Sequence, residues 1–564
     1  MGYLEVYKSW VDDRFFDEHT RKELKCITSE KEIEDRFYKE LEFGTGGLRE
    51  IMGAGTNRLN KYTVGKVTLG LGHYLLDTYG KDACIERGVV IGFDTRNNSK
   101  EYARVVADVL TGLGVRVYLM KDARPIPQLS FSVPYYKALA GVVITASHNP
   151  KEYNGYKVYD EFGCQLVPSQ ADRVIQYVNK VKDYHSIDFK GNDSLLTFID
   201  NTEEFVSEVY KQQRIKNEII KNNLNVVYTP LHGSGRIPVS MILKRDGFNC
   251  VELVKEQAND DGNFSTVKSP NPEDKEALTL GIELAKELNA DIVLGTDPDC
   301  DRVGIAVKDA NNEYKLLTGN QIGSLLMDFI IRHTDLSELE KPAIVKTIVT
   351  SELGAKIAEK NDIEVFSTLT GFKFIGEKIT QFEKAKDQDD LSRNFDYLFG
   401  YEESYGYLCG THARDKDAVV SSMLICEMAA EAKSQNKTLI DKLNDIYNEY
   451  GYYKDVLESF TLKGKDGIEK INEMMNTLRN ECPFTDVEKI SDFNKTTFEE
   501  HGFGTYPISN VLKYELKDGS WVAVRPSGTE PKIKIYYSIR GNDESDANVR
   551  FETIQNLIKT RMGL

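Results

Sequence analysis

The sequence lacks the usual marks of a secreted, membrane-spanning or zinc-binding protein. Its eight cysteines are spread over 564 residues, and none lies within four residues of another, so no CxxC zinc or redox pattern is present. The N-terminus has no apolar signal region, and no apolar run approaches the ~18 residues that span a bilayer. We therefore expect a cytoplasmic protein with reduced thiols and no membrane partner.

Positive charge is also scarce. The 72 lysines and arginines face 89 acidic residues, which gives a formal net charge of -17. Because a nucleic-acid binder needs a positive surface to displace counterions, this balance argues against a nucleic-acid partner. Walker A and GxGxxG patterns are missing too, so nucleotide-binding folds of those types are not supported. An acidic protein can still bind phosphorylated small molecules if its cations are concentrated at one site.

The chain is too long for a single hydrophobic core. Short β-branched runs alternate with amphipathic segments, which predicts α/β layers. The predicted strands are 89–91, 141–144, 226–228 and 292–294, and the predicted helices are 103–113 and 275–288. Near the N-terminus, Ser29 and Glu32 predict a capping box that starts a helix running to Leu41.

Three apolar runs end alike, in a glycine, one further residue and an acid, at Asp94, Asp297 and Glu402. This similarity suggests three related α/β domains. The last hundred or so residues differ, with a predicted helix at 467–479 and strands at 521–524 and 533–536. We therefore predict three related α/β domains with mixed sheets plus a smaller C-terminal α+β domain. The predicted boundaries are 1–205, 206–318, 319–452 and 453–564.

Polar motifs follow two of the predicted strands. Residues 145–150 (TASHNP) place Ser147 in a loop that Pro150 keeps irregular, although Ser, Asn and Pro are also common in ordinary turns. Residues 297–302 (DPDCDR) carry alternating aspartates that can converge. Two such charges ~4 Å apart repel by ~4 kcal/mol at an effective dielectric of about 20. Convergence therefore needs a cation, and oxygen ligands suit Mg²⁺.

Two other interpretations of the aspartate motif can be weighed. An EF-hand loop starting at Asp297 requires Gly at its sixth position and Glu at its twelfth, but Arg302 and Lys308 stand there. An Asp-x-Asp phosphatase that uses Asp297 as nucleophile stays open. Cys300 is expected to point away from the aspartates, because alternate residues of an extended loop face opposite ways.

Two further motifs lie in the C-terminal half. Residues 401–406 (YEESYG) offer acids and a hydroxyl that can bind sugar hydroxyls, although a solvated Glu-Glu pair is commoner. Residues 525–529 (RPSGT) combine an arginine, which grips phosphate bidentately, with a glycine that admits backbone N–H groups. An ordinary turn between two strands is the alternative.

Together, the four loops resemble those of the α-D-phosphohexomutase superfamily. That family has a Thr-Ala-Ser-His-Asn-Pro phosphoserine loop, then an Asp-x-Asp-x-Asp-Arg metal loop, a Glu-x-Ser sugar loop and an Arg-x-Ser-Gly-Thr phosphate loop, in the order found here. The resemblance spans roughly residues 42–564 and is greatest to bacterial phosphoglucomutases related to the phosphopentomutase branch. One departure is Tyr401, where the best-studied phosphoglucomutases have Gly, and this leaves the sugar open.

The resemblance implies roles for individual residues. Arg49 and Lys157 are similar to the family's active-site arginine and the lysine near the phosphoserine, and His148 is a second candidate for proton transfer. One Mg²⁺ per chain would be held by Asp297, Asp299, Asp301 and an oxygen of phosphorylated Ser147. The implied substrate-binding residues are Arg302, Thr370, Gly371, Lys373, Glu402, Ser404, Arg414 and Lys416. The implied phosphate-binding residues are Arg525, Ser527, Gly528 and Thr529.

The implied activity interconverts α-D-glucose 1-phosphate and glucose 6-phosphate. It would proceed through a phosphoserine enzyme and glucose 1,6-bisphosphate, which also serves as activator. Phosphopentomutase or phosphomannomutase activity with the same mechanism is the alternative. An aspartyl-phosphate phosphatase and a non-catalytic sugar-phosphate sensor represent other classes. The expected partners are small-molecule sugar phosphates, and the chain is expected to be a monomer or homodimer.

Overall fold

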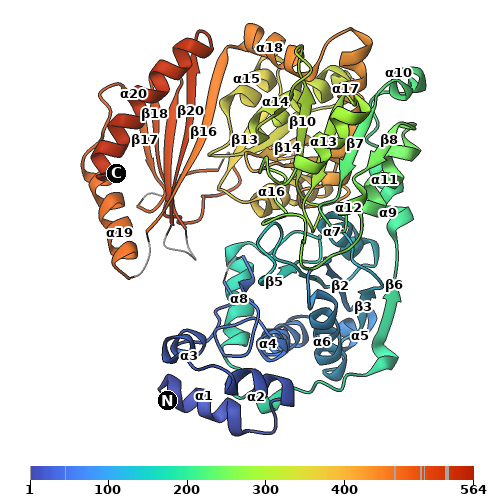
Figure 1. Cartoon of the computed structure of the whole chain (residues 1–564), viewed down its shortest axis with the longest axis vertical. Coiled ribbons are helices and arrows are strands. Elements are labelled where there is room, and N and C mark those ends of the chain that lie inside the picture. The colour runs from blue at the N-terminus through green and yellow to red at the C-terminus, as the bar shows by residue number, and fades with distance from the viewer. Residues whose placement is uncertain (1, 45, 463–464, 496–497, 501, 528–531) are drawn as a thin grey trace. The chain divides into compact units, whose positions relative to one another are not determined.

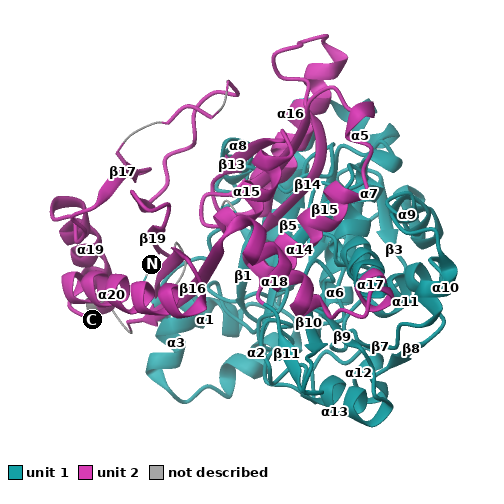
Figure 2. Ribbon diagram, turned by 90° about the horizontal axis from the view of Figure 1, so that it is seen from above, with its two compact units in different colours: residues 1–317, 406–430 teal, residues 318–405, 431–564 magenta. Residues whose placement is uncertain are grey.

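A computed structural model of the chain describes residues 2–44, 46–462, 465–495, 498–500, 502–527 and 532–564. It divides into two compact units, residues 1–317 with 406–430 and residues 318–405 with 431–564 (Figure 2). Helices and strands alternate through most of the chain (Figure 1), and four sheets form. The predicted fold class is confirmed: three mixed or parallel sheets are packed with helices, and the C-terminal sheet is antiparallel. The four predicted domain boundaries stay a prediction.

The first sheet has the order β1-β5-β4-β2-β3-β6. Its strands are β1 (Leu48–Ile51), β2 (Val89–Phe93), β3 (Val117–Met120), β4 (Ala140–Ile144), β5 (Tyr153–Tyr159) and β6 (Leu196–Ile199). β2 is parallel to β3 and β4, whereas β5 is antiparallel to β4 and β1. Both faces are buried, because Ile91 and Ile144 belong to one hydrophobic core and Val90 and Val143 to another. The helices of this region are α4 (Lys61–Tyr79), α5 (Lys81–Glu86), α6 (Ser99–Gly112), α7 (Ile126–Tyr135) and α8 (Pro168–Val178).

Three helices precede this sheet, α1 (Tyr3–Asp12), α2 (Glu18–Lys25) and α3 (Glu30–Phe37), and they share a small core around Trp10. The helix predicted to reach Leu41 ends at Phe37. Residues 39 and 41 instead bond to Thr56, through the Thr56 hydroxyl and carbonyl. Half of the predicted capping box forms: Ser29 caps the Glu32 amide, but the Glu32 carboxylate pairs with Arg36.

The second sheet also belongs to the first unit and has the order β11-β10-β9-β7-β8. Its strands are β7 (Val226–Thr229), β8 (Val251–Leu253), β9 (Ile292–Thr296), β10 (Val303–Lys308) and β11 (Tyr314–Leu316). The helices are α9 (Thr202–Tyr210), α10 (Glu218–Asn222), α11 (Arg236–Arg245), α12 (Lys255–Ala258) and α13 (Thr279–Leu288). The helix predicted from residue 275 begins at Thr279, because the chain before it forms successive turns. β15 (Gly406–Cys409) and most of α17 (Ala418–Ser434) complete the unit.

The second unit contains the C-terminal sheet and three of the four strands of the remaining sheet. In the latter, β12 (Pro342–Thr347) is parallel to both β13 (Glu364–Thr368) and β14 (Asp396–Glu402). Its helices are α14 (Gly319–Arg332), α15 (Glu352–Lys360), α16 (Phe372–Asp387) and α18 (Leu439–Tyr450). Short 3₁₀ helices elsewhere in the chain lie at Tyr184–Ser186, Asp193–Leu195 and Leu336–Glu338.

The C-terminal sheet is antiparallel throughout, with the order β16-β20-β19-β18-β17. Its strands are β16 (Tyr452–Thr461), β17 (Val487–Asp492), β18 (Leu512–Leu516), β19 (Trp521–Pro526) and β20 (Lys532–Gly541). Helices α19 (Lys465–Asn480) and α20 (Glu544–Met562) cover one face (Figure 1) and share a core with the strands.

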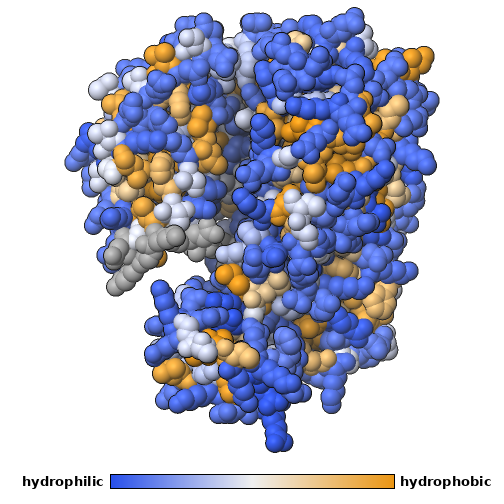
Figure 3. Space-filling view, in the orientation of Figure 1, coloured by the Kyte–Doolittle hydropathy of each residue, from blue (hydrophilic) through white to orange (hydrophobic). Residues whose placement is uncertain are grey.

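Hydrophilic residues cover most of the molecular face in Figure 3, with hydrophobic residues in smaller groups between them. This surface agrees with the acidic, charge-rich composition. Among the described residues, we find no helix with the length and hydrophobicity needed to cross a bilayer.

Candidate active site

The Ser147 loop leaves the sheet at the end of β4 and returns into β5. Ser147 is buried and has a left-handed backbone, with φ of 53°. Its amide donates to the Thr145 hydroxyl at 2.9 Å, which fixes the first turn of the loop. Gly155 on β5 lets the strands close around the loop, because a Cβ there would lie 2.5 Å from the Thr145 carbonyl oxygen. A left-handed non-glycine residue is uncommon, and such residues gather at functional sites.

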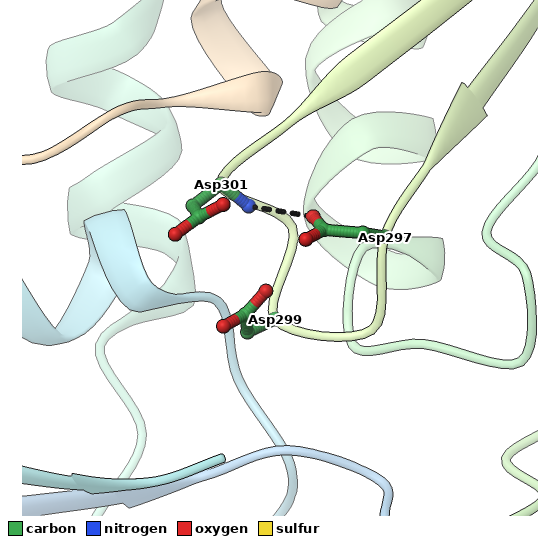
Figure 4. Close-up of side chains that lie close together, drawn as sticks. All are labelled: Asp297, Asp299 and Asp301. Atoms are coloured by element: carbon green, nitrogen blue, oxygen red, sulfur yellow. Dashed lines mark hydrogen bonds between the residues drawn. The ribbon is translucent and has the colours of Figure 1, made fainter. Parts of the chain in front are cut away.

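Asp297, Asp299 and Asp301 lie on the turn between β9 and β10. All three side chains are fully buried, and their ligand oxygens lie within 4.8 Å of one another. Figure 4 shows the carboxylates gathered around one space, with the Asp301 amide donating to Asp297 Oδ1 at 3.2 Å. Over the described ranges, which omit residues such as 528–531, this is the one cluster of three potential metal ligands of the His, Cys, Asp or Glu type.

The electrostatics of this cluster call for a cation. Burial and the neighbouring Asp299 charge raise the pKa of Asp297 well above its ordinary value, and the same two causes raise the pKa of Asp301. Burial acts in that direction on Asp299 too, but Lys157, Asp297 and Lys416 outweigh it and lower the pKa of Asp299. Asp299 Oδ1 and Asp301 Oδ1 are buried and accept no hydrogen bond. Buried carboxylate oxygens in this arrangement fit a hard metal ion.

The serine loop and the aspartate turn meet in the first unit. The Ser147 hydroxyl donates to Asp297 Oδ2 at 2.8 Å. The Thr145 hydroxyl lies 3.1 Å from Asp299 Oδ2. The structure therefore brings the predicted nucleophile against the predicted metal ligands, although 150 residues separate Ser147 from Asp297 in the chain.

Two lysines border the aspartates. Lys157 Nζ lies 3.4 Å from Asp299 and 3.9 Å from Asp301. Lys416 Nζ lies 3.0 Å from Asp301. We predicted Lys416 as a substrate-binding residue. Its ammonium group also faces the carboxylate of Asp301, a predicted metal ligand. Together the two lysines offset part of the negative charge that a phosphorylated Ser147 would increase.

His148 and Arg49 flank the serine. His148 Nδ1 lies 3.2 Å from the Ser147 hydroxyl oxygen. Burial lowers the pKa of His148 well below its ordinary value, and the charges of Arg302 and Arg49 add to this effect. Arg49 lies on β1 and donates to the Asn149 side chain at 3.3 Å, so it belongs to the same loop environment.

Cys300 points away from the predicted ligands. It is fully buried, and its sulfur packs against Gly235, where an added Cβ would lie only 2.7 Å from it. Burial raises the pKa of its thiol well above the ordinary value. This placement agrees with the expected packing role. The aspartate turn itself is held by Ser234, whose amide and hydroxyl both donate to the Pro298 carbonyl, at 2.9 and 2.8 Å.

The predicted sugar loop lies in the second unit at the end of β14. Glu402 is buried, and the Ser404 hydroxyl donates to Glu403 at 3.3 Å. Tyr401 is fully buried, and its ring packs between two helices: a Cβ on Gly323 or Gly354 would lie 2.2 Å from it. The tyrosine that departs from the family pattern therefore packs against α14 and α15.

The other predicted residues have varied environments. Thr370, Gly371 and Lys373 lie at the start of α16, where Gly371 has φ of 120° and open space around it. Arg302 pairs with Glu273 at 2.7 Å. The remaining residues are Arg414, which donates to carbonyls of its own loop, Arg525 at the end of β19, and Ser527, whose amide donates to the Lys532 carbonyl. Gly528 and Thr529 lie outside the described residues.

Sequence reasoning missed the residues that hold the two loops. Asp94 was singled out as a strand-end acid, but its contact with Thr145 (2.6 Å) depends on how β2 and β4 pair. Arg96, two residues later, donates to carbonyls of the Ser147 loop. Ser234 had no motif signal of its own. An arginine two residues after a strand-end acid could have been noted, but its partners could not.

Comparison with known proteins decides the family. The curated phosphoglucomutase of Staphylococcus epidermidis is 38% identical over 543 residues, covering 94% of this chain and 96% of the relative. The Staphylococcus aureus phosphoglucomutase is 39% identical over 530 residues, covering 92% and 93%. This chain belongs to the phosphoglucomutase/phosphomannomutase family. Its matches to that family are the alpha/beta/alpha domains I (40–185), II (203–311) and III (318–450) and the C-terminal domain (463–553).

A solved structure with the same fold is the exocytosis-sensitive phosphoprotein parafusin, a phosphoglucomutase from Paramecium. It superposes with a TM-score of 0.69 at 16% identity, over 93% of this chain and 96% of that one. Membership of the superfamily, predicted from four short motifs, is thus confirmed over nearly the whole chain. A family enzyme with a metal cofactor agrees with the buried aspartate cluster.

Proposed function

We propose that this protein is a phosphoglucomutase that interconverts α-D-glucose 1-phosphate and glucose 6-phosphate through a phosphoserine at Ser147. The observation that carries the proposal is the hydrogen bond of 2.8 Å between the Ser147 hydroxyl and Asp297, one of three clustered buried aspartates. The full-length similarity to curated phosphoglucomutases supports the choice of reaction. A binding protein would need neither a buried serine nor a metal cluster beside it.

Asp297, Asp299 and Asp301 would hold the metal, which we propose to be one Mg²⁺ per chain, together with an oxygen of phosphorylated Ser147. The three protein side chains all offer carboxylate oxygens, and these ligands suit a hard ion such as Mg²⁺ better than softer metal ions. When bound, the ion would withdraw charge from the phosphoryl group as it transfers. Two of the carboxylate oxygens accept no hydrogen bond in the described structure, which supports their use as ligands.

The transfer forms a bond between phosphorus and a sugar hydroxyl oxygen and breaks the bond between phosphorus and Ser147 Oγ. The sugar hydroxyl loses its proton, for which Lys157 in its neutral form is our first candidate acceptor and His148 the second, and Ser147 Oγ takes up a proton as the phosphoryl group leaves. Arg49 and Lys157 would stabilise negative charge that spreads over the phosphoryl oxygens. The product, glucose 1,6-bisphosphate, then turns and returns its other phosphoryl group to Ser147.

The bisphosphate must bind in two orientations. We propose that the phosphate remote from Ser147 is held by Arg525, Ser527, Gly528 and Thr529 in both. Glu402 and Ser404 would bind sugar hydroxyls that lie similarly in the two orientations. Other substrate contacts would come from Arg302, Thr370, Gly371, Lys373, Arg414 and Lys416. We expect a cytoplasmic monomer or homodimer.

A coupled assay tests this proposal. Purified protein with Mg²⁺ and a trace of glucose 1,6-bisphosphate should convert glucose 1-phosphate to glucose 6-phosphate, followed as NADPH produced by glucose-6-phosphate dehydrogenase. Ser147→Ala, which keeps the shape of the loop, should lose at least about 1,000-fold in kcat. Rates with mannose and ribose phosphates, measured on the same protein preparation, rank the two alternative substrates. Equal activity of Ser147→Ala would contradict the phosphoserine.

An aspartyl-phosphate phosphatase that uses Asp297 remains the rival from another class. Asp297 Oδ1 already accepts the amides of Asp301 and Arg302, at 3.2 and 3.0 Å. Its other oxygen accepts the Ser147 hydroxyl, so both carboxylate oxygens already accept hydrogen bonds. Hydroxylamine separates the two, because an aspartyl phosphate is cleaved by it and a phosphoserine is stable.

A further inference from the structure

One arginine, Arg96, donates hydrogen bonds to the backbone of the Ser147 loop. Arg96 Nη1 donates to the carbonyls of Pro150 (2.9 Å) and Tyr153 (3.2 Å). Its Nη2 donates to the carbonyls of Ser147 and Asn149. A single guanidinium therefore contacts four main-chain oxygens of one loop, including that of the nucleophile itself. Its side chain is fully buried.

The loop has left the sheet here, so the Ser147 and Asn149 carbonyls have no strand amide opposite them, while the Pro150 carbonyl also accepts the Tyr153 amide at 3.1 Å. Ser147 is left-handed and Pro150 offers no amide, so regular backbone pairing is lost over this stretch. A buried carbonyl without a partner costs about 1–3 kcal/mol. An arginine brings five N–H donors in a fixed plane, whereas a lysine brings three from a single atom. The geometry therefore calls for an arginine rather than for positive charge alone.

Arg96 is itself fixed by its surroundings. Its Nε lies 3.2 Å from the buried Asp94 carboxylate, and its guanidinium stacks 4.9 Å from the Phe264 ring centre. Asp94 also accepts the Thr145 hydroxyl at 2.6 Å, and that hydroxyl accepts the Ser147 amide. The network thus reaches Ser147 at both its amide and its carbonyl, and leaves its side chain to face the aspartates.

We propose that Arg96 is a positioning residue for phosphoryl transfer: it fixes the Ser147 backbone so that the hydroxyl faces the aspartate cluster. Its guanidinium donates to backbone carbonyls and packs against buried side chains, so its effect passes through the loop rather than through contact with the substrate. The inference rests on the proposed phosphoserine reaction. The position of the Ser147 hydroxyl can be tested even with the sugar unidentified, because phosphorylation of Ser147 can be measured directly.

The test is Arg96→Lys in the full-length protein. A displacement of the nucleophile by about 1 Å costs on the order of 100-fold in rate. We therefore expect kcat and the rate of Ser147 phosphorylation by glucose 1,6-bisphosphate each to fall about 100-fold. KM for glucose 1-phosphate should stay within about threefold, because the residues proposed to bind the sugar lie on other loops. Amide hydrogen exchange over residues 145–153 should become faster.

Arg58→Lys is the matched control. Arg58 is also buried in the first unit, but it bonds to the Asn57 carbonyl and the Asp35 carboxylate, away from the Ser147 loop. Its replacement should cost stability without changing kcat or exchange at 145–153. If folded Arg96→Lys keeps kcat within threefold, or changes KM instead of kcat, the proposal is wrong.

A milder variant covers the case in which Arg96→Lys does not fold. Phe264→Leu removes the ring against which the guanidinium stacks, and it should lower kcat threefold to tenfold at unchanged KM. Unchanged kcat would overturn the positioning role. Ser147→Ala in the same series separates the two claims, because full activity there contradicts the phosphoserine itself. An inactive Ser147→Ala with a fully active Phe264→Leu contradicts only the role of Arg96.

Discussion

Asp297→Asn should make the metal-free protein more stable while destroying its response to metal. Asparagine has the shape of aspartate and can still accept the amides of Asp301 and Arg302 through its oxygen. It removes one of three buried charges whose ligand oxygens lie within 4.8 Å of one another. At that spacing and an effective dielectric of about 20, each pair of charges repels by about 3.5 kcal/mol before its neighbours are counted.

The Arg302 charge offsets part of this repulsion at Asp297, and Lys157 and Lys416 lie beside the other two aspartates, so we expect a net gain of about 1–2 kcal/mol. The sign follows from the pKa of Asp297, which is raised in the folded protein. A carboxylate with a raised pKa stabilises the fold below its unfolded pKa and loses that contribution as pH rises through the folded pKa. Above the unfolded pKa, Asp297 therefore lowers the free energy of unfolding, and replacing it removes that cost.

Thermal unfolding in EDTA and in excess Mg²⁺ measures both effects. Without metal, the variant should melt a few degrees above the parent protein, since 1 kcal/mol shifts the melting point by about 2–4 °C in domains of roughly 150–250 residues and by less in larger ones. Mg²⁺ should raise the melting point of the parent but not of the variant. Asp309→Asn is the control: it caps the turn after β10 and should leave the metal response intact. A variant that melts lower than the parent in EDTA would refute the reasoning.

Three further predictions concern other groups. Burial raises the pKa of Asp455 to about 6, so its stabilising effect is lost as pH rises from about 4 to about 6, and Asp455→Asn should raise the melting point at pH 7.5 but not at pH 3.5. Tyr401→Phe should leave the ratio of kcat/KM values for glucose and mannose phosphates unchanged, because the ring packs against helices; a changed ratio, with mannose 6-phosphate converted to glucose 6-phosphate by added isomerases before detection, would place it at the sugar. Lys416→Met should lower kcat at least tenfold through loss of the cation 3.0 Å from Asp301, with Lys416→Arg recovering part of it; equal rates for all three proteins would count against this.

Local pattern predicted much of the fold. β2, β4, β7 and β9 are fully buried parallel or mixed-sheet strands, and such strands appear as short apolar runs. Helix ends were harder. The helix at Glu30 stops at Phe37 because Thr56, distant in sequence, bonds to residues 39 and 41. Propensity carries no information about such a partner.

The candidate site shows the same difference between residues found from local pattern and residues that depend on distant contacts. Ser147 and the aspartates were predicted because each lies directly after an apolar run in a motif with its own chemistry. Arg96 was missed because its partners are main-chain carbonyls, which any sequence supplies. Tyr401 left the sugar open in the sequence, and its packing against Gly323 and Gly354 is a tertiary contact that its residue type did not predict. Motifs thus predict the candidate reacting groups, whereas the residues that hold them depend on tertiary contacts.

The most direct test of the account is peptide mass spectrometry of the Mg²⁺-loaded protein after incubation with glucose 1,6-bisphosphate and removal of the excess. We predict one phosphate on the peptide that contains Ser147, stable to hydroxylamine and lost when glucose 6-phosphate is added. A peptide that stays unmodified, or a phosphate that hydroxylamine removes from the peptide containing Asp297, would contradict the phosphoserine mechanism.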